Sequence, residues 1–287
     1  LAEDDTSEIT NNLIKRYERR IKRVLQRNDE DIFLLAINIM TRQFDPHSTY
    51  LSPYNAEDFE IDMSLKLAGI GALLSTSATE DFTIIVSLVP GGPAEKNSEL
   101  KPNDKIVKVK QHNEDIFEDV TGWRIDEVVQ KVRGEPKTIV TLEIIPGDAE
   151  DNSVRKIIEI EREIVKLEER AAKSKIYSLN KNGNIYKIGI INLPSFYLDF
   201  DAWQSRDPNY KSSSKDVRKI LEDFKNQSVD AVLVDLRNNS GGALSEANQL
   251  TGLFTSAGAT LQIKESNGKP IAGLRVKRSE GPIFKIC

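Results

Sequence analysis

The chain has 287 residues, of which 39% are hydrophobic and 30% are charged, and this mixture excludes a disordered polymer. Its formal net charge is −5 with both signs interspersed, so no positive field favours nucleic acid as a partner. No apolar run approaches the roughly 18 residues of a membrane span. The single cysteine, Cys287, excludes an internal disulfide and a cysteine metal cluster.

The length suits about two domains. The chain starts at Leu1 and shows no charged-then-apolar signal segment, so we expect a mature product or a fragment. Nothing in the sequence indicates a metal or an organic cofactor: the two histidines, His47 and His112, are few, and the HExxH spacing is absent.

The first 60 residues are predicted to be helical. Apolar residues recur every four positions over Ile9–Leu25 and form one apolar stripe. A second helix is predicted over about Asp29–Gln43, with Asn28 or Asp29 as its N-cap. Pro46 and Pro53 follow, and we expect them to break the helix because proline cannot continue one.

From about residue 65 to residue 148 the chain changes to short strands and two short helices. The pattern of β-branched and alternating apolar residues predicts strands over Thr83–Val89, Asp104–Val109 and Thr138–Ile145. One short helix is expected to open at Gly91–Ala94, and another is predicted over Ile125–Val132. This arrangement is typical of a compact, partly open β-barrel.

From Val154 onward, strands and helices alternate. Strands are predicted over Val154–Ile160, Ile185–Leu193, Ala231–Leu236 and Thr260–Ile263. Helices are predicted after the cap candidates Ser212–Ser214 and over Glu246–Phe254. This order favours a parallel sheet with crossover helices. Phe196 and Tyr197 follow the second strand, and two interpretations stay open: packing against the sheet, or lining of a substrate groove.

Gly69-Ile70-Gly71-Ala72 is the first motif that carries chemistry. Its glycines leave the backbone amides open, and such amides can hold a carboxylate. A bare tight turn would look the same. With the downstream stretches Val89–Ala94 and Leu100–Ile106, however, the motif resembles a PDZ domain. In that family the loop binds the C-terminal carboxylate of a peptide, which adds to the sheet edge as a strand.

The second motif is Asp235–Gly242 (DLRNNSGG), between a buried strand and a helix. Gly241 and Gly242 expose the backbone beside a helix N-terminus, which favours an anion. The anion would be an oxyanion in an acyl-transfer enzyme, or a phosphate in a nucleotide enzyme. The phosphate interpretation is weak because no phosphate-loop motif is present. A third interpretation is a strand–helix turn whose glycines allow tight packing.

The chain resembles the tail-specific, carboxy-terminal processing proteases, most closely their Gram-negative periplasmic branch. The resemblance is carried by Asp45–Leu51, Met63–Ala72, Gly122–Arg124, Val165–Ala171 and Val234–Ala243, in order. It implies an α+β fold with three parts. These are an N-terminal helical segment (1–62), a PDZ domain with a partly open β-barrel (63–150), and the first part of a ClpP/crotonase-like αβ core with a mainly parallel sheet (151–287).

The resemblance also implies a serine endopeptidase that cleaves proteins marked by apolar, free C-terminal tails, in the periplasm and without a cofactor. An adaptor protein is a further partner to consider. Residue by residue, Gly69, Ile70, Gly71 and Ala72 would bind the tail carboxylate. Gly241 and Gly242 would help to build the oxyanion hole. Ser240 stands where the family commonly has glycine, and its side chain would narrow the turn.

The family's nucleophile is a serine in a run of small residues, activated by a later lysine. We expect that run to follow a strand that starts at Gly281–Phe284, and the chain stops at Cys287. We therefore assign neither catalytic residue and expect the chain by itself not to hydrolyse peptide bonds. The competing hypothesis is a peptide-tail-binding module without catalysis. A triad using His47 is disfavoured, because Pro46 and the helix exit favour a structural role.

Overall fold

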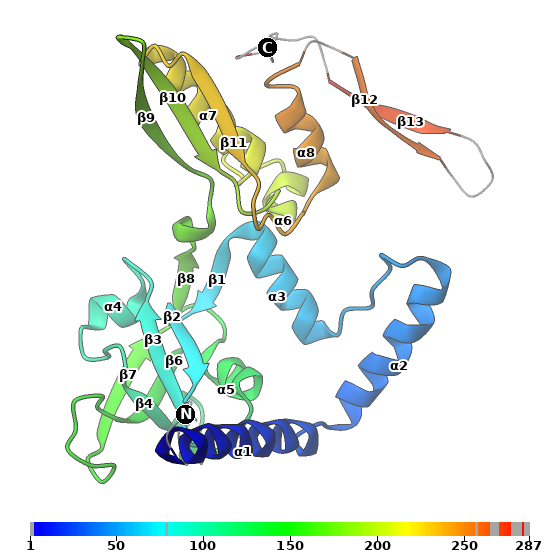
Figure 1. Ribbon diagram of the computed structural model, residues 1–287. Helices are drawn as coiled ribbons and strands as arrows, with labels where there is room; N and C mark the ends of the chain where they lie inside the picture. Colours follow the sequence, from blue (N-terminus) through cyan, green and yellow to red (C-terminus); the bar gives the residue numbers. More distant parts are fainter. Residues whose placement is uncertain (1–2, 78–79, 256–257, 265–269, 277–282, 284–287) are drawn as a thin grey trace. The chain divides into compact units, whose positions relative to one another are not determined.

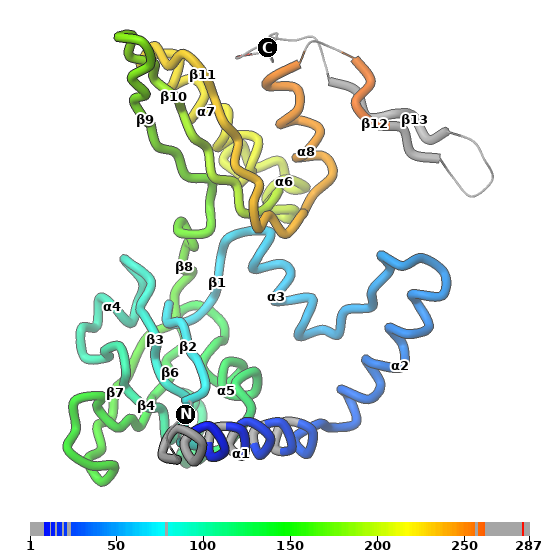
Figure 2. The backbone as a smooth tube through the Cα atoms, viewed as in Figure 1, coloured from blue at the N-terminus to red at the C-terminus, as the bar shows by residue number. Residues whose placement is uncertain are grey.

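The computed structural model describes residues 3–77, 80–255, 258–264, 270–276 and 283 of the chain (Figures 1 and 2). The chain divides into two compact units, Leu1–Asp58 and Phe59–Cys287. Among the described residues, no helix is both long enough and apolar enough to cross a membrane.

The first unit consists of helices. Helix α1 covers Glu3–Leu25, and α2 covers Asp29–Phe44, which confirms the predicted second helix. Asn28 caps α2 because its side chain accepts from the Asp31 N–H at 3.0 Å, while the Asp31 carboxylate accepts from the Asn28 N–H at 3.1 Å. No residue of α2 is buried within the described structure.

Helix α3, Pro53–Ser64, begins within the segment expected to be helical, but it was not predicted as a separate helix. Pro53 was expected only to end the preceding helix. Proline is tolerated at the first position of a helix, where its missing N–H would have no partner anyway. Helix α2 has already ended at Phe44, so Pro53 starts a helix and does not end one.

The first part of the second unit is an antiparallel sheet with the strand order β2-β3-β4-β6-β7. Its strands, with β5 paired to β4 off the main path, are β2 Ala72–Thr76, β3 Thr83–Leu88, β4 Lys105–Gln111, β5 Glu118–Asp119, β6 Ile139–Ile145 and β7 Lys156–Glu161. Helices α4, Pro93–Asn97, and α5, Ile125–Val132, confirm both predicted short helices. Their apolar residues join one buried cluster with the sheet.

A two-stranded ribbon leads into and out of this sheet. Strand β1, Lys66–Gly69, pairs antiparallel with β8, Glu163–Lys166. Leu65, which precedes β1, has a φ of 54° and is buried in the apolar cluster that also contains Val165 and Leu167. The ribbon was not predicted.

The remaining chain forms a three-stranded sheet with the order β11-β10-β9 (Figure 1). Strand β10, Asn184–Asn192, pairs parallel with β11, Ala231–Asp235, and antiparallel with β9, Lys173–Lys181. Helix α7, Ser213–Asn226, provides the predicted crossover and is capped by Ser212. The helix comes so close to β10 that a Cβ on Gly189 would lie 2.3 Å from the Phe224 ring.

Helix α8, Leu244–Thr251, follows β11, and β12, Gly258–Lys264, pairs antiparallel with β13, Pro270–Val276. The short helices η1, Glu168–Arg170, and α6, Phe200–Gln204, complete the unit. The strand expected to start at Gly281–Phe284 lies outside the described residues, apart from Ile283, whose N–H donates to the Leu253 carbonyl at 2.9 Å. The expected α+β fold with a parallel crossover is confirmed. The described core sheet is not mainly parallel, however, because it has one parallel and one antiparallel strand pair.

Candidate functional site

The predicted carboxylate loop, Gly69–Ala72, connects β1 to β2. The carbonyls of the loop accept hydrogen bonds from neighbouring segments. The Ala94 N–H donates to the Ile70 oxygen, and the Val89 N–H donates to the Gly71 oxygen, both at 2.8 Å. The Ile70 side chain is buried. Gly71 has a φ of 72°, a conformation that favours glycine. The loop is therefore fixed through its carbonyls and side chains rather than through its N–H groups.

The N–H groups of Ile70, Gly71 and Ala72 remain available, whereas Gly69 pairs with Glu163 in the β1–β8 ribbon. Those of Ile70 and Gly71 make no hydrogen bond to any described residue. The Val89–Gly71 bond makes that pair a hydrogen-bonded position between β2 and β3, so the next pair, Ala72 and Leu88, is a non-hydrogen-bonded one. The Ala72 N–H consequently points away from β3. Three successive amides can therefore donate to one anion.

Strand β2 lies at the edge of its sheet, because β3 is its only strand neighbour among the described residues. Its free edge can accept another extended chain. Helix α5 contacts β2 and supplies a wall beside that edge. The apolar residues of strand and helix belong to one cluster, in which Val128 and Val132 are buried and Ala72 and Leu74 are partly buried. The open edge of β2 is therefore bordered by apolar side chains.

The glycine turn after β11 is held by the side chain of Asn239. Its Nδ2 donates to the Leu193 carbonyl at 2.9 Å, and its Oδ1 accepts from the Gly241 N–H at 2.8 Å. The Ser240 N–H donates to the Pro194 carbonyl at 3.0 Å. The turn is thus fastened to the segment that follows β10.

Gly242 lies directly against Phe196. The Phe196 N–H donates to the Gly241 carbonyl at 2.7 Å, and the Ala243 N–H donates to the Phe196 carbonyl at 2.8 Å. A Cβ on Gly242 would lie 2.4 Å from the Phe196 oxygen. The Gly242 N–H makes no hydrogen bond with a described residue. Of the two amides predicted to serve an oxyanion, Gly242 therefore has a free donor and Gly241 donates within its own loop.

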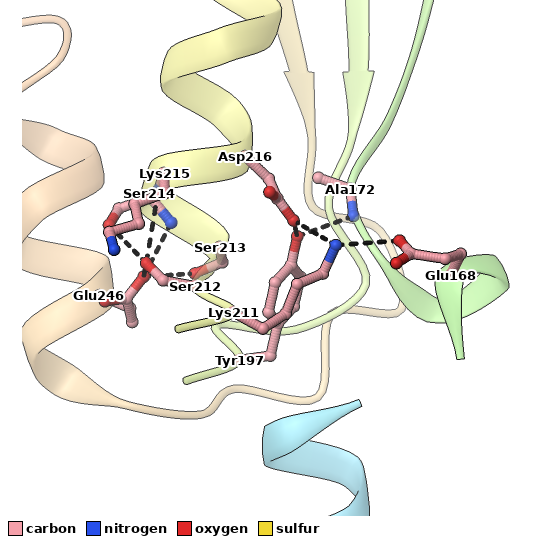
Figure 3. A network of polar contacts seen from close by, with 10 residues as sticks. All are labelled: Glu168, Ala172, Tyr197, Lys211, Ser212, Ser213, Ser214, Lys215, Asp216 and Glu246. Carbon is pink, nitrogen blue, oxygen red and sulfur yellow. Dashed lines mark hydrogen bonds and ion pairs between the residues drawn. The ribbon is translucent and has the colours of Figure 1, made fainter. Parts of the chain in front are cut away.

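A buried carboxylate, which sequence reasoning missed, joins the start of α8 to the start of α7 (Figure 3). Glu246, in the first turn of α8, has no exposed surface. Its Oε2 accepts from the Ser212 hydroxyl at 2.6 Å, the Ser213 hydroxyl at 3.0 Å and the Ser214 N–H at 2.8 Å. Its Oε1 is buried without a partner among the described residues. The only local signal was an acidic residue near a helix start.

A second polar network surrounds Tyr197 (Figure 3). Tyr197 is fully buried; its hydroxyl donates to Asp216 at 2.6 Å and accepts from the Ala172 N–H at 3.1 Å. Burial, reinforced by Asp216, raises the pKa of Tyr197. Lys211 bridges Asp216 at 3.0 Å and Glu168 at 2.9 Å. For Tyr197, the packing interpretation is therefore right and the groove-lining one is wrong.

The other candidates do not form a catalytic centre. The His47 side chain is 93% exposed, and its Nδ1 lies 3.3 Å from the Oδ1 of Asp45 in its own turn. Cys287 lies outside the described residues. Within the described part of the chain, no three histidine, cysteine or acidic side chains are placed to hold a metal ion.

Three family models match consecutive parts of the sequence. Residues 1–54 match the tail specific protease N-terminal domain, residues 59–145 match the PDZ domain, and residues 187–284 match peptidase family S41. The matched PDZ segment contains the loop Gly69–Ala72. The matched S41 segment contains the turn with Gly241 and Gly242.

The chain is also similar to individual proteins. It is 38% identical over 266 residues to a tail-specific protease of Haemophilus influenzae, a match that covers 93% of this chain and 35% of the relative. It is 28% identical over 259 residues to the carboxy-terminal processing protease CtpA of Bacillus subtilis, covering 89% and 48%. The chain thus spans less than half the length of these relatives.

Among solved structures, the PDZ domain of a carboxy-terminal protease from Vibrio cholerae in complex with peptide is 39% identical; the match covers 36% of this chain and 99% of that one, with a TM-score of 0.33. A photosystem II D1 C-terminal processing protease is 19% identical, covering 88% and 60%, with a TM-score of 0.38.

Proposed function

This chain belongs to the family of tail-specific, carboxy-terminal processing proteases, and we propose that it functions in a serine endopeptidase that selects its protein substrates by their C-terminal tails. We propose a division into a helical segment (1–62), a PDZ domain (63–150) and part of the protease core (151–287). Strand β7 lies beyond the second boundary but pairs with β6, so the sheet of the PDZ domain extends past residue 150. By family membership we also propose a periplasmic location.

The observation that carries this proposal is the loop between β1 and β2. Ile70, Gly71 and Ala72 present N–H groups without partners among the described residues, at the end of an open strand edge. A terminal carboxylate accepts several such bonds, whereas an internal peptide group offers one carbonyl oxygen. In the proposed complex, the loop Gly69–Ala72 binds the carboxylate through the N–H groups of its last three residues, and the tail extends along β2. The apolar cluster beside the edge favours apolar tails.

For the chemical step, we assign the Gly242 N–H and the start of α8 to the developing oxyanion. The positive end of a helix and a free amide both stabilise negative charge there. Gly241 contributes directly only if its N–H leaves Asn239. In the family, the nucleophile is a serine and the base is a lysine, and we assign neither to a residue of this chain.

Tail capture is tested by calorimetry with one acetylated apolar peptide, prepared with a free C-terminus and with an amidated one. We expect at least a tenfold weaker affinity for the amide, because the loop amides lose a charged acceptor. Equal affinities would refute carboxylate capture.

A pair of glycine variants localises the effect. Gly71→Val adds a side chain whose Cβ would lie 3.3 Å from the Val165 Cγ2 in β8 and 3.3 Å from the Gly92 Cα before α4, so the loop must shift. Gly91→Val is the matched control: its φ of 73° nearly equals the 72° of Gly71, but nothing lies within 4 Å of its Cβ position. We expect only Gly71→Val to abolish tail binding.

The endopeptidase part is tested on the product of the whole reading frame. A serine-reactive phosphonate should label it at one serine, and the product should cleave a tailed protein but not its amidated form. Tail binding without labelling or cleavage would instead favour the binding module.

A further inference from the structure

Arg162, between β7 and β8, holds a buried positive charge that forms no ion pair with any residue that the structure describes. Only 3% of the residue is exposed. Its guanidinium donates to the carbonyls of Val132 at 2.9 Å and Lys131 at 3.0 Å, to Gln111 Oε1 at 2.7 Å and to Thr138 Oγ1 at 2.9 Å. All four acceptors are uncharged. Because burying an unpaired charge is costly, this arrangement calls for an explanation.

Two of these acceptors are the last residues of helix α5. The final carbonyls of a helix lack partners within the helix and carry its partial negative charge. The guanidinium binds the carbonyls of Lys131 and Val132, and Gln111 Nε2 adds a bond to the Lys131 carbonyl at 2.8 Å. Arg162 therefore caps the negative end of α5 from inside the fold.

This end of α5 adjoins the carboxylate loop. The Cβ position of Gly69 lies 3.8 Å from the Cα of Arg133, the C-cap residue of α5. The Cβ position of the next residue, Gly134, lies 3.0 Å from the Arg162 Cζ. On the other side, Glu163, which follows Arg162 in sequence, pairs with Gly69 in the β1–β8 ribbon. Arg162 thus contacts the end of α5 on one side of the loop and directly precedes the β8 strand of the ribbon on the other side.

An anion held at this loop would otherwise face the negative end of a helix. We propose that Arg162 is a positioning residue for the tail carboxylate: it neutralises the end of α5 and supplies the positive field that lets the amides of Ile70–Ala72 hold an anion. This inference rests on the proposed tail capture. It explains why a buried guanidinium lacks a carboxylate of its own: the ligand supplies the negative charge.

The test compares how strongly the 287-residue chain and its variants discriminate a free-acid peptide from the same peptide as an amide. The probe is an acetylated peptide ending in Val-Ala-Val-Ala. We expect Arg162→Met to lower the ratio of the two dissociation constants about 3- to 10-fold, because removing a nearby positive charge weakens the binding of the charged peptide more than that of the amide. Arg162→Lys keeps the charge and should stay within about twofold of the wild-type ratio.

A merely structural role for Arg162 would weaken both peptides equally and leave the ratio unchanged. Lys156→Met is the control, because it removes a partly exposed positive charge from the far end of β7, where Lys156 pairs with Glu99 at 3.0 Å. If the wild type discriminates strongly between the two peptides and Arg162→Met discriminates equally strongly, the proposed role of Arg162 is wrong but tail capture stands. A wild-type ratio near 1 would overturn tail capture itself, and this inference with it.

If Arg162→Met does not fold, the comparison passes to Arg162→Lys and Arg162→Gln, which differ in charge while both keep hydrogen-bond donors. A lower ratio in Arg162→Gln than in Arg162→Lys supports the proposal. Equal ratios in these two variants contradict it.

Discussion

Gly242 and Phe196 are packed backbone to backbone: a Cβ on Gly242 would lie 2.4 Å from the Phe196 oxygen, and the residues on either side of Gly242 exchange hydrogen bonds with Phe196. The glycine at this position is therefore required by contact as well as by its φ of 137°. Gly241, with a φ of 87° and open space at its Cβ position, is required only by conformation.

The first prediction separates these two glycines by their stability cost. Gly241→Ala should lower the free energy of unfolding by about 1 kcal/mol, the usual cost of a left-handed alanine. Gly242→Ala should cost about 3 kcal/mol or more, because it adds a clash with Phe196 to an unfavourable φ. Urea unfolding followed by Trp203 fluorescence, in a Trp123→Phe background, measures both. Equal costs would contradict the contact.

The second prediction concerns the buried carboxylate of Glu246. Glu246→Leu leaves the hydroxyls of Ser212 and Ser213 and the N–H of Ser214 without their acceptor, so unfolding should become easier by about 2–4 kcal/mol. Glu246→Gln keeps one acceptor oxygen and should cost about half as much. Glu222→Gln, on the exposed side of α7, is the control and should stay within about 0.5 kcal/mol. A Leu variant as stable as the control would refute the network.

The third prediction is a pH dependence. Because the pKa of Tyr197 is raised in the folded protein, the native state holds this proton more tightly than the unfolded chain, whose tyrosines ionise near pH 10. The contribution is complete below about pH 10 and is lost as the pH rises further, at up to about 1.4 kcal/mol per pH unit. Above pH 10, unfolding free energy should therefore fall more steeply in the wild type than in Tyr197→Phe.

The control for this titration is Tyr177→Phe, because Tyr177 is exposed on β9. Its pH profile should follow the wild type. At neutral pH, Tyr197→Phe should itself cost about 1–2 kcal/mol, since the Ala172 N–H loses its buried acceptor. Parallel profiles for the wild type and Tyr197→Phe above pH 10 would show that this hydroxyl is not held protonated by the fold.

Local patterns in the sequence predicted most of the regular elements. Helix α5 was predicted with its observed bounds, because its apolar stripe and the glycine beyond its end are local features. The loop at Gly69–Ala72 and the turn at Gly241 and Gly242 were found for the same reason. Whether these loops bind a carboxylate and an oxyanion remains a prediction.

What was missed depends mostly on contacts between distant residues. The β1–β8 ribbon pairs four-residue strands about a hundred positions apart, and Glu246 meets Ser212 from another helix. In the sequence, Arg162 is one charged residue among several neighbouring charged residues, and nothing there indicates that it is buried. One local signal was overlooked: Asn182 and Gly183, with φ of 55° and 81°, form the turn between β9 and β10, and Asn-Gly is a strong hairpin signal.

The most direct test of carboxylate capture follows the backbone N–H resonances of Ile70, Gly71 and Ala72 in the isotope-labelled chain during a peptide titration. With a free-acid peptide, all three should move downfield as they acquire a charged acceptor, and the amidated peptide at the same occupancy should leave them nearly unchanged. Free-acid binding that leaves these three resonances in place, or equal movements with both peptides, would contradict the account.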